Sequence, residues 1–74
     1  MTRRKRELLI KFGKRVRKER LRQKLTQEEL AFRALVHRTY IGMVERAEKN
    51  ITLETILKIC KALSIEPEKL FSDL

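Results

Sequence analysis

The sequence predicts an all-α fold, a single domain of five helices that spans residues 1–74. Apolar residues recur at intervals of three and four along most of the chain, which is the period of an amphipathic helix. No segment alternates convincingly between apolar and polar residues with the period of two that strands show. A chain of 74 residues is also one small domain by its length alone.

The first helix is expected over residues 7–23, after a basic arm formed by residues 1–6. Leu9, Phe12 and Val16 lie on one side of this helix, at the spacing of an amphipathic face. The other sides carry almost only lysine and arginine. We therefore expect one face of the helix in the core and the rest in solvent.

The second helix is expected over residues 27–34. Thr26 is followed three residues later by Glu29, the spacing of a capping box, in which each side chain bonds the other residue's free backbone amide. This pair fixes the start of the helix. Leu30 and Ala31 are expected to point inward.

The third helix is expected over residues 38–47, and its two faces differ in chemistry when the chain is projected at about 100° per residue. The core face consists of Tyr40, Ile41, Val44, Glu45 and Ala47. The outer face consists of Arg38, Thr39, Gly42, Met43 and Arg46. The outer face is thus a short surface of low relief with two guanidinium groups and one hydroxyl.

The last two helices are predicted from the residues at which they start. Thr52 is a good N-cap for a fourth helix, which we expect to end near Ser64. A short fifth helix is expected to begin at Pro67, because proline suits the first position of a helix.

The charge of the chain is strongly basic and unevenly distributed. The formal net charge is +9, yet residues 1–24 alone carry +10, residues 25–50 carry zero and residues 51–74 carry −1. A merely solvated surface would mix the two signs along the chain. The basic block therefore predicts a polyanionic partner, with nucleic acid preferred over an anionic membrane or an acidic protein.

The composition argues against several function classes. One His, one Cys and one Asp, with no glycine-rich phosphate loop and no paired ligands, predict neither an enzyme nor a metal or cofactor site. No stretch approaches the roughly 18 apolar residues of a membrane span. Because Cys60 is the only cysteine, we expect no internal disulfide and a reducing, cytoplasmic location.

The middle of the chain resembles a known family of regulators. The run Leu25-Thr-Gln-Glu-Glu-Leu-Ala, then Thr39-Tyr-Ile-Gly-Met-Val-Glu, is similar to the helix-turn-helix of the phage Cro and repressor (XRE) type. Arg38-Thr-Tyr-Ile-Gly, Val44-Glu-Arg and Glu48-Lys-Asn-Ile-Thr-Leu resemble the controller proteins of restriction–modification systems. The resemblance implies a dimer that binds palindromic operators in double-stranded DNA and both activates and represses transcription, a role that can involve RNA polymerase.

The resemblance also implies roles for individual residues, because the second motif helix enters the major groove. The residues expected to contact bases are Arg38, Thr39, Gly42 and Met43, with Arg38 the candidate for a bidentate bond to guanine. The residues expected to contact phosphates are Gln27, His37, Tyr40, Arg46, Asn50 and Thr52.

Some of these residues have a structural interpretation that stays open. Thr26 and Thr52 can be helix caps only, and His37 can be the N-cap of the third helix. Gly42 can be a merely tolerated glycine. Many relatives carry glycine where this chain has Lys24, Leu35 and Ala47, so either these loops are helical or the backbone carries strain.

Arg20 and Glu45 are expected to form a structural ion pair. Both project onto the apolar sides of their helices, where an unpaired charge is costly. A mutual pair between the first and third helices satisfies both charges, and related proteins have a similar pair.

The C-terminal third carries more apolar surface than a small protomer is expected to cover, and so predicts a homodimer. The residues expected at the dimer interface are Ile59, Ile65, Leu70, Phe71 and Leu74. A two-fold dimer places its recognition helices about one DNA turn, or roughly 34 Å, apart.

Three alternatives to a restriction–modification controller remain at this point. The chain can be a generic repressor of the same class or an antitoxin-like regulator that binds a toxin and DNA together. A basic protein of the membrane surface is also compatible with the amphipathic first helix.

Overall fold

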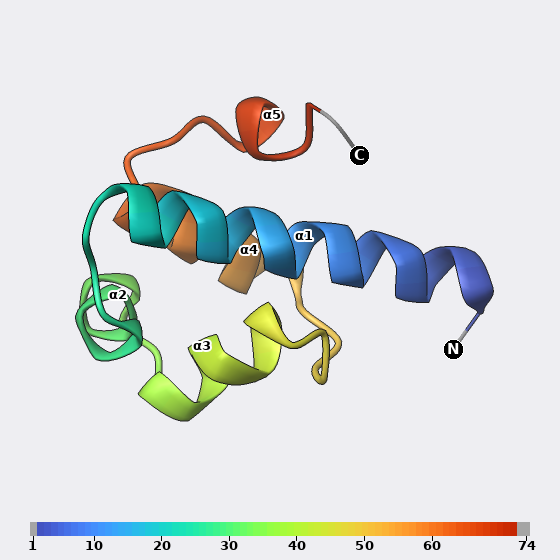
Figure 1. The fold of residues 1–74 in the computed structure, drawn as a ribbon, viewed down its shortest axis with the longest axis horizontal. Coiled ribbons are helices and arrows are strands. Elements are labelled where there is room, and N and C mark those ends of the chain that lie inside the picture. Colours follow the sequence, from blue (N-terminus) through green and yellow to red (C-terminus); the bar gives the residue numbers. More distant parts are fainter. Residues whose placement is uncertain (1, 73–74) are drawn as a thin grey trace.

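The computed structural model describes residues 2–72, and this part of the chain forms five helices, which confirms the predicted fold class. The helices are α1 (Arg3–Arg22), α2 (Gln27–Ala34), α3 (Arg38–Glu45), α4 (Leu53–Ala62) and α5 (Pro67–Leu70). The long helix α1 crosses the molecule, with α3 on one side of it and α5 on the other (Figure 1). The helices α2 and α4 pack against each other and complete the bundle.

Residues 3–6 of the expected basic arm are helical instead. Helix α1 begins at Arg3, four residues before the expected start, and the Thr2 side chain caps it by accepting a hydrogen bond from the Lys5 amide at 3.2 Å. Arginine and lysine are good helix formers, so a cap this early lets the helix continue through the charged residues. The first turns of α1 extend beyond the other helices (Figure 1), and residues 3–7 are exposed.

The motif helices α2 and α3 start where the sequence predicts. Thr26 and Glu29 form the complete capping box, with hydrogen bonds of 3.0 and 2.9 Å. Helix α3 ends at Glu45, two residues before the expected end. The cause is the backbone of Ala47, whose φ of 58° is left-handed and cannot continue a right-handed helix.

Four helices end in the same way without a glycine. Lys24, Leu35, Ala47 and Ser64 follow α1 to α4 with φ between 55° and 59°. In each case the next amide reaches back five residues along the chain, as Val36 does to the Ala31 carbonyl at 3.0 Å, which is the Schellman pattern. Of the two alternatives for Lys24, Leu35 and Ala47, a helical loop or a strained backbone, the strained backbone is therefore the correct one.

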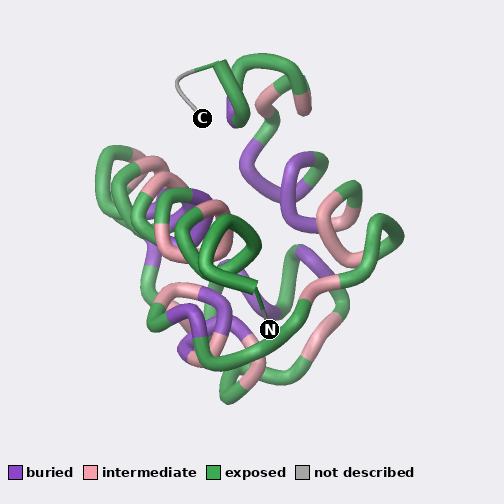
Figure 2. The backbone as a smooth tube through the Cα atoms, turned by 90° about the vertical axis from the view of Figure 1, so that its right-hand side faces the viewer, coloured by how far each residue is buried: buried purple, intermediate pink, exposed green. Residues whose placement is uncertain are grey.

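The core lies between the helices, and buried positions turn towards it from every helix (Figure 2). Two residues expected at a dimer interface, Ile59 and Leu70, are fully buried inside the protomer. That part of the prediction is wrong, because α4 and α5 fold back onto α2 and α1 and cover both side chains. Ile65 is half-buried, Phe71 is partly exposed, and Leu74 lies outside the described residues.

Candidate nucleic-acid interface

Helix α3 combines a buried face with an exposed polar one. Ile41 and Val44 are buried against the core, whereas Arg38 and Thr39 are exposed. His37 caps the helix, since its Nδ1 accepts a hydrogen bond from the Thr39 amide at 3.0 Å. The structure confirms the two-faced character of this helix and the capping role open to His37, but of the residues predicted on the outer face Gly42 is buried and Met43 is half-buried.

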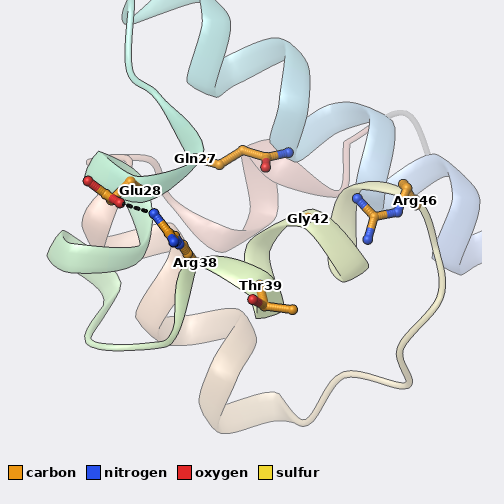
Figure 3. A pocket seen from close by; sticks show the side chains of 6 residues that line it. All are labelled: Gln27, Glu28, Arg38, Thr39, Gly42 and Arg46. Atoms are coloured by element: carbon orange, nitrogen blue, oxygen red, sulfur yellow. Dashed lines mark hydrogen bonds and ion pairs between the residues drawn. The ribbon is translucent and has the colours of Figure 1, made fainter.

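A shallow hollow of about 410 Å³ lies between α2 and the exposed face of α3 (Figure 3). Its lining residues are Gln27, Glu28, Arg38, Thr39, Gly42 and Arg46. The fold thus gathers three of the four residues expected to contact bases and two of those expected to contact phosphates. The fourth expected base contact, Met43, is half-buried and does not line the hollow.

A chain of hydrogen bonds behind the hollow ties three helices together. Arg20 donates to both carboxylate oxygens of Glu45, at 2.7 and 3.1 Å, and to the Leu25 carbonyl at 2.8 Å. The two side chains are only 9% and 3% exposed, so the predicted ion pair is present and almost completely buried. Gln27 Nε2 also donates to Glu45, at 3.1 Å. The buried pair therefore fixes the Gln27 side chain at the edge of the hollow.

Gly42 keeps the floor of the hollow open. A Cβ atom at this position would lie 2.9 Å from Arg46 Nη1 and 3.5 Å from Gln27 Oε1. Both neighbours are ends of flexible side chains, so the fold itself does not require glycine here. A side chain at position 42 would instead fill part of the space above the α3 backbone.

Each guanidinium on this face is paired with a carboxylate. Arg38 Nη1 lies 2.6 Å from Glu28 Oε2, and Arg46 Nε lies 3.0 Å from Glu48 Oε2. The Glu48 carboxylate raises the pKa of Arg46, and Arg46 lowers the pKa of Glu48. Glu28 is not recognisable as a site residue in the sequence, because only the folded turn brings the start of α2 next to the start of α3.

The remaining residues expected to contact phosphates lie around the hollow rather than in it. Thr52 is the N-cap of α4 and accepts a hydrogen bond from the Thr55 amide at 3.2 Å. Tyr40 is half-buried and packs against the core. Asn50 is exposed and borders a second, mostly apolar hollow of about 260 Å³ beside α1. Their contacts with DNA stay predictions.

Other chemistry is not visible in the described part of the chain. Residues 2–72 hold no group of three His, Cys, Asp or Glu side chains placed to bind a metal ion. None of the helices described is long and apolar enough to cross a membrane. Cys60 is buried, and its burial raises the pKa of the thiol.

Two short helices joined by a tight turn, the second with an exposed polar face over a hollow, define a helix-turn-helix protein. A family model described as "Helix-turn-helix" matches residues 16–70. The control protein C.BamHI of Bacillus amyloliquefaciens is 47% identical over 60 residues, which are 80% of this chain and 74% of the relative. The chain belongs to the helix-turn-helix family and, within it, to the control proteins of restriction–modification systems.

Solved structures agree with this assignment. The restriction–modification controller protein C.AhdI of Aeromonas hydrophila has a TM-score of 0.83 and 49% identity, over 85% of this chain and 96% of that one. The controller protein C.Esp1396I, solved as a tetramer with its natural 35 base-pair operator, has a TM-score of 0.83 and 35% identity, over 88% and 86%. This is a family of DNA-binding regulators rather than of enzymes.

Proposed function

We propose that this protein is a homodimeric regulator of transcription that binds a palindromic operator and controls a restriction–modification system. The observation that carries the proposal is the hollow on α3, where Arg38, Thr39 and Gln27 converge on one exposed surface. The operator complex of the related C.Esp1396I supports the same kind of partner. RNA polymerase belongs to the proposal as the protein that a regulator bound at a promoter contacts or excludes.

In the proposed complex α3 enters the major groove of DNA. Arg38 donates two hydrogen bonds to a guanine, and Thr39 contacts a neighbouring base through its hydroxyl or methyl group. Gln27 and the free amides at the start of α2 bind a phosphate, as helix N-termini commonly do. Arg46 binds a second phosphate, so the motif is held at both ends of the hollow.

A membrane-surface role has less support. The apolar side of α1 is occupied, because Phe12 and Val16 are buried in the core. The same helix packs against α3 and α5, and Phe12 stacks on Phe71 with ring centroids 5.3 Å apart. A lipid surface would have to open this core before it could bind the apolar face.

The proposal is tested first by selecting binding sites from random double-stranded DNA. We expect the selected sequences to share a palindrome whose half-sites are about one helical turn apart. In the genome, genes for a methyltransferase and an endonuclease are expected next to the gene for this protein. Selection of no common sequence would contradict the proposal.

The role of Arg38 is tested by Arg38→Ala. We expect the variant to lose about 1–3 kcal/mol of discrimination at one base position in each half-site, because the bidentate bond to that base is gone. The measurement compares binding to the selected site and to its single-base variants. Arg33→Ala is the matched control, since Arg33 is exposed on α2 and does not line the hollow. Equal losses on selected and random DNA would contradict the role of Arg38.

The proposed dimer surface is the exposed face of α4 together with Phe71. Leu53 and Leu57 are one turn apart on this helix and remain 70% and 48% exposed. Large apolar side chains exposed side by side are typical of an interface. We expect the protein to sediment as a dimer at micromolar concentration and Leu57→Lys to sediment as a monomer. Phe32→Lys, which removes an exposed apolar residue from α2, is expected to remain dimeric; a monomeric wild type would contradict the proposal.

A further inference from the structure

A carboxylate at the edge of a surface that binds DNA requires an explanation, since it lies where phosphates approach. Four glutamates lie between residues 25 and 50. Glu29 completes the capping box, Glu45 forms the buried pair with Arg20, and Glu48 binds Arg46 outside the hollow. Glu28 differs from these three because it lines the hollow itself.

The contact of Glu28 leaves most of the Arg38 guanidinium available. Glu28 is the second residue of α2 and Arg38 the first residue of α3, and Glu28 Oε2 binds Arg38 Nη1 at 2.6 Å (Figure 3). A guanidinium has five donor hydrogens in a rigid plane. A carboxylate on Nη1 therefore restricts the guanidinium and leaves the donors of Nη2 and Nε available for a second planar acceptor.

The pair contributes little to the stability of the fold. The side chains of Arg38 and Glu28 are 67% and 69% exposed, and ion pairs in such surroundings are screened by water and salt. Helix α2 has a complete capping box without Glu28. Glu28 also lies in the first turn of α2, where the helix dipole favours a negative charge, but that effect does not depend on the contact with Arg38.

We propose that Glu28 is a positioning residue that sets the specificity of DNA binding: it holds the Arg38 guanidinium towards a base edge and keeps it from binding phosphate. The inference rests on the proposed function, in which Arg38 reads a base. A guanidinium fixed before binding loses less conformational freedom when it meets guanine. The carboxylate also repels any phosphate that would compete for the same donors, so non-specific binding is weakened.

The test measures how Glu28→Gln changes binding to the selected palindrome, to variants at the base that Arg38 reads, and to random DNA. We expect discrimination at that base to fall by up to about fivefold, which is the range that an exposed ion pair can contribute. We expect tighter binding to random DNA and a salt dependence steeper by up to about 0.9 in log–log slope, because one more cation reaches phosphate. The thermal midpoint of unfolding is expected to fall by no more than a few degrees, because the variant loses only the interaction of Glu28 with the dipole of α2 and an exposed ion pair.

Two further variants separate this effect from a general change in charge. Glu68→Gln removes the same charge from α5, on the opposite side of α1 from α3 (Figure 1), and is expected to leave discrimination unchanged. In an Arg38→Ala background, Glu28→Gln is expected to have no effect on discrimination, since its partner is absent. Such a cycle isolates the coupling between the two residues.

The outcomes distinguish the inference from the function on which it rests. If the wild type binds selectively and Glu28→Gln discriminates between bases equally well, the inference is overturned and the proposed function stands. An equal effect of Glu28→Gln with and without Arg38 would also overturn it, because Glu28 would then act independently. A wild type that prefers no sequence would overturn both.

Discussion

The two glycines of the chain serve different purposes. Gly13 lies where α1 crosses α3, and a Cβ atom there would lie 2.4 Å from the Val44 carbonyl oxygen and 2.9 Å from that of Glu45. Both neighbours are backbone atoms, so the two helices would have to move apart. Gly42 faces only flexible side chains. Gly13 is therefore required by packing, whereas Gly42 matters to the open surface above α3.

Alanine substitutions at these positions are expected to have opposite effects on stability. Gly13→Ala should lower the free energy of unfolding by about 1–3 kcal/mol, the usual cost of forcing extra volume into a packed core. Gly42→Ala should raise the free energy of unfolding by at most about 1 kcal/mol, since alanine is the better helix former. Urea denaturation measures both. Similar losses in the two variants would contradict the distinction.

Residues whose role is local, or is fixed by helical periodicity, could be predicted from the sequence. The capping box depends on residues three apart, and the Arg20–Glu45 pair follows from two charges on apolar helix faces. The contact between Glu28 and Arg38 could not be predicted, because it joins residues ten apart across a turn without glycine or proline. The same holds for the close approach at Gly13, which depends on how two helices cross.

At the level of elements, the strained helix ends follow directly from the lack of glycine. A left-handed conformation costs a residue with a side chain about 1–2 kcal/mol. Each of the four ends regains hydrogen bonds to otherwise free carbonyls through the Schellman pattern. Leu35 shows the cost most clearly, because it is 82% exposed and its side chain gains little by packing.

Leu35→Gly is expected to stabilise the protein. Relief of the left-handed strain outweighs the greater freedom of glycine in the unfolded chain, so we expect a gain of about 0.5–1 kcal/mol. Arg33→Gly is the control, because glycine introduced within α2 should lower the free energy of unfolding by about 1 kcal/mol. Thermal or urea unfolding compares the two. A loss in Leu35→Gly would show that its side chain makes a stabilising contact.

The helix starts could be predicted better than the helix ends. Thr26 and Thr52 are typical N-cap residues and so predict the starts of α2 and α4. Both helices begin directly after them. The sequence predicts the end of α3 two residues late, because alanine itself favours a helix, and only the glycine that many relatives carry at the position of Ala47 indicates a left-handed backbone there. The sequence predicts the start of α1 four residues late, because the apolar pattern begins only after several exposed basic residues.

At the level of the whole molecule, attraction to DNA and recognition of its sequence are assigned to different regions. Helix α1 carries most of the basic excess, and its first turns extend beyond the other helices (Figure 1). The hollow that we propose reads sequence lies in residues 25–50, which have no net charge. Because these basic residues belong to a helix rather than a loose arm, their Cα atoms are held at a fixed spacing.

This separation predicts that the basic end of α1 affects affinity without affecting specificity. Arg4 and Arg6 suit the test best, since Arg3 pairs with Glu7 and Lys5 borders the apolar hollow beside α1. The double variant Arg4→Ala with Arg6→Ala should bind all sequences more weakly. Its log–log salt slope should fall by roughly 0.9 for each phosphate that is no longer bound, while the ratio of specific to random binding stays constant.

The matched control removes two lysines far from α3, with Lys61→Ala and Lys69→Ala on the ends of α4 and α5. These substitutions change the net charge of the protein by the same amount, so long-range attraction to DNA falls equally in both variants. The two variants differ only in whether the removed cations bind phosphate directly, and the salt slope should therefore fall in the α1 variant alone. A selective loss of operator binding in the α1 variant would mean that the first turns of this helix read sequence as well.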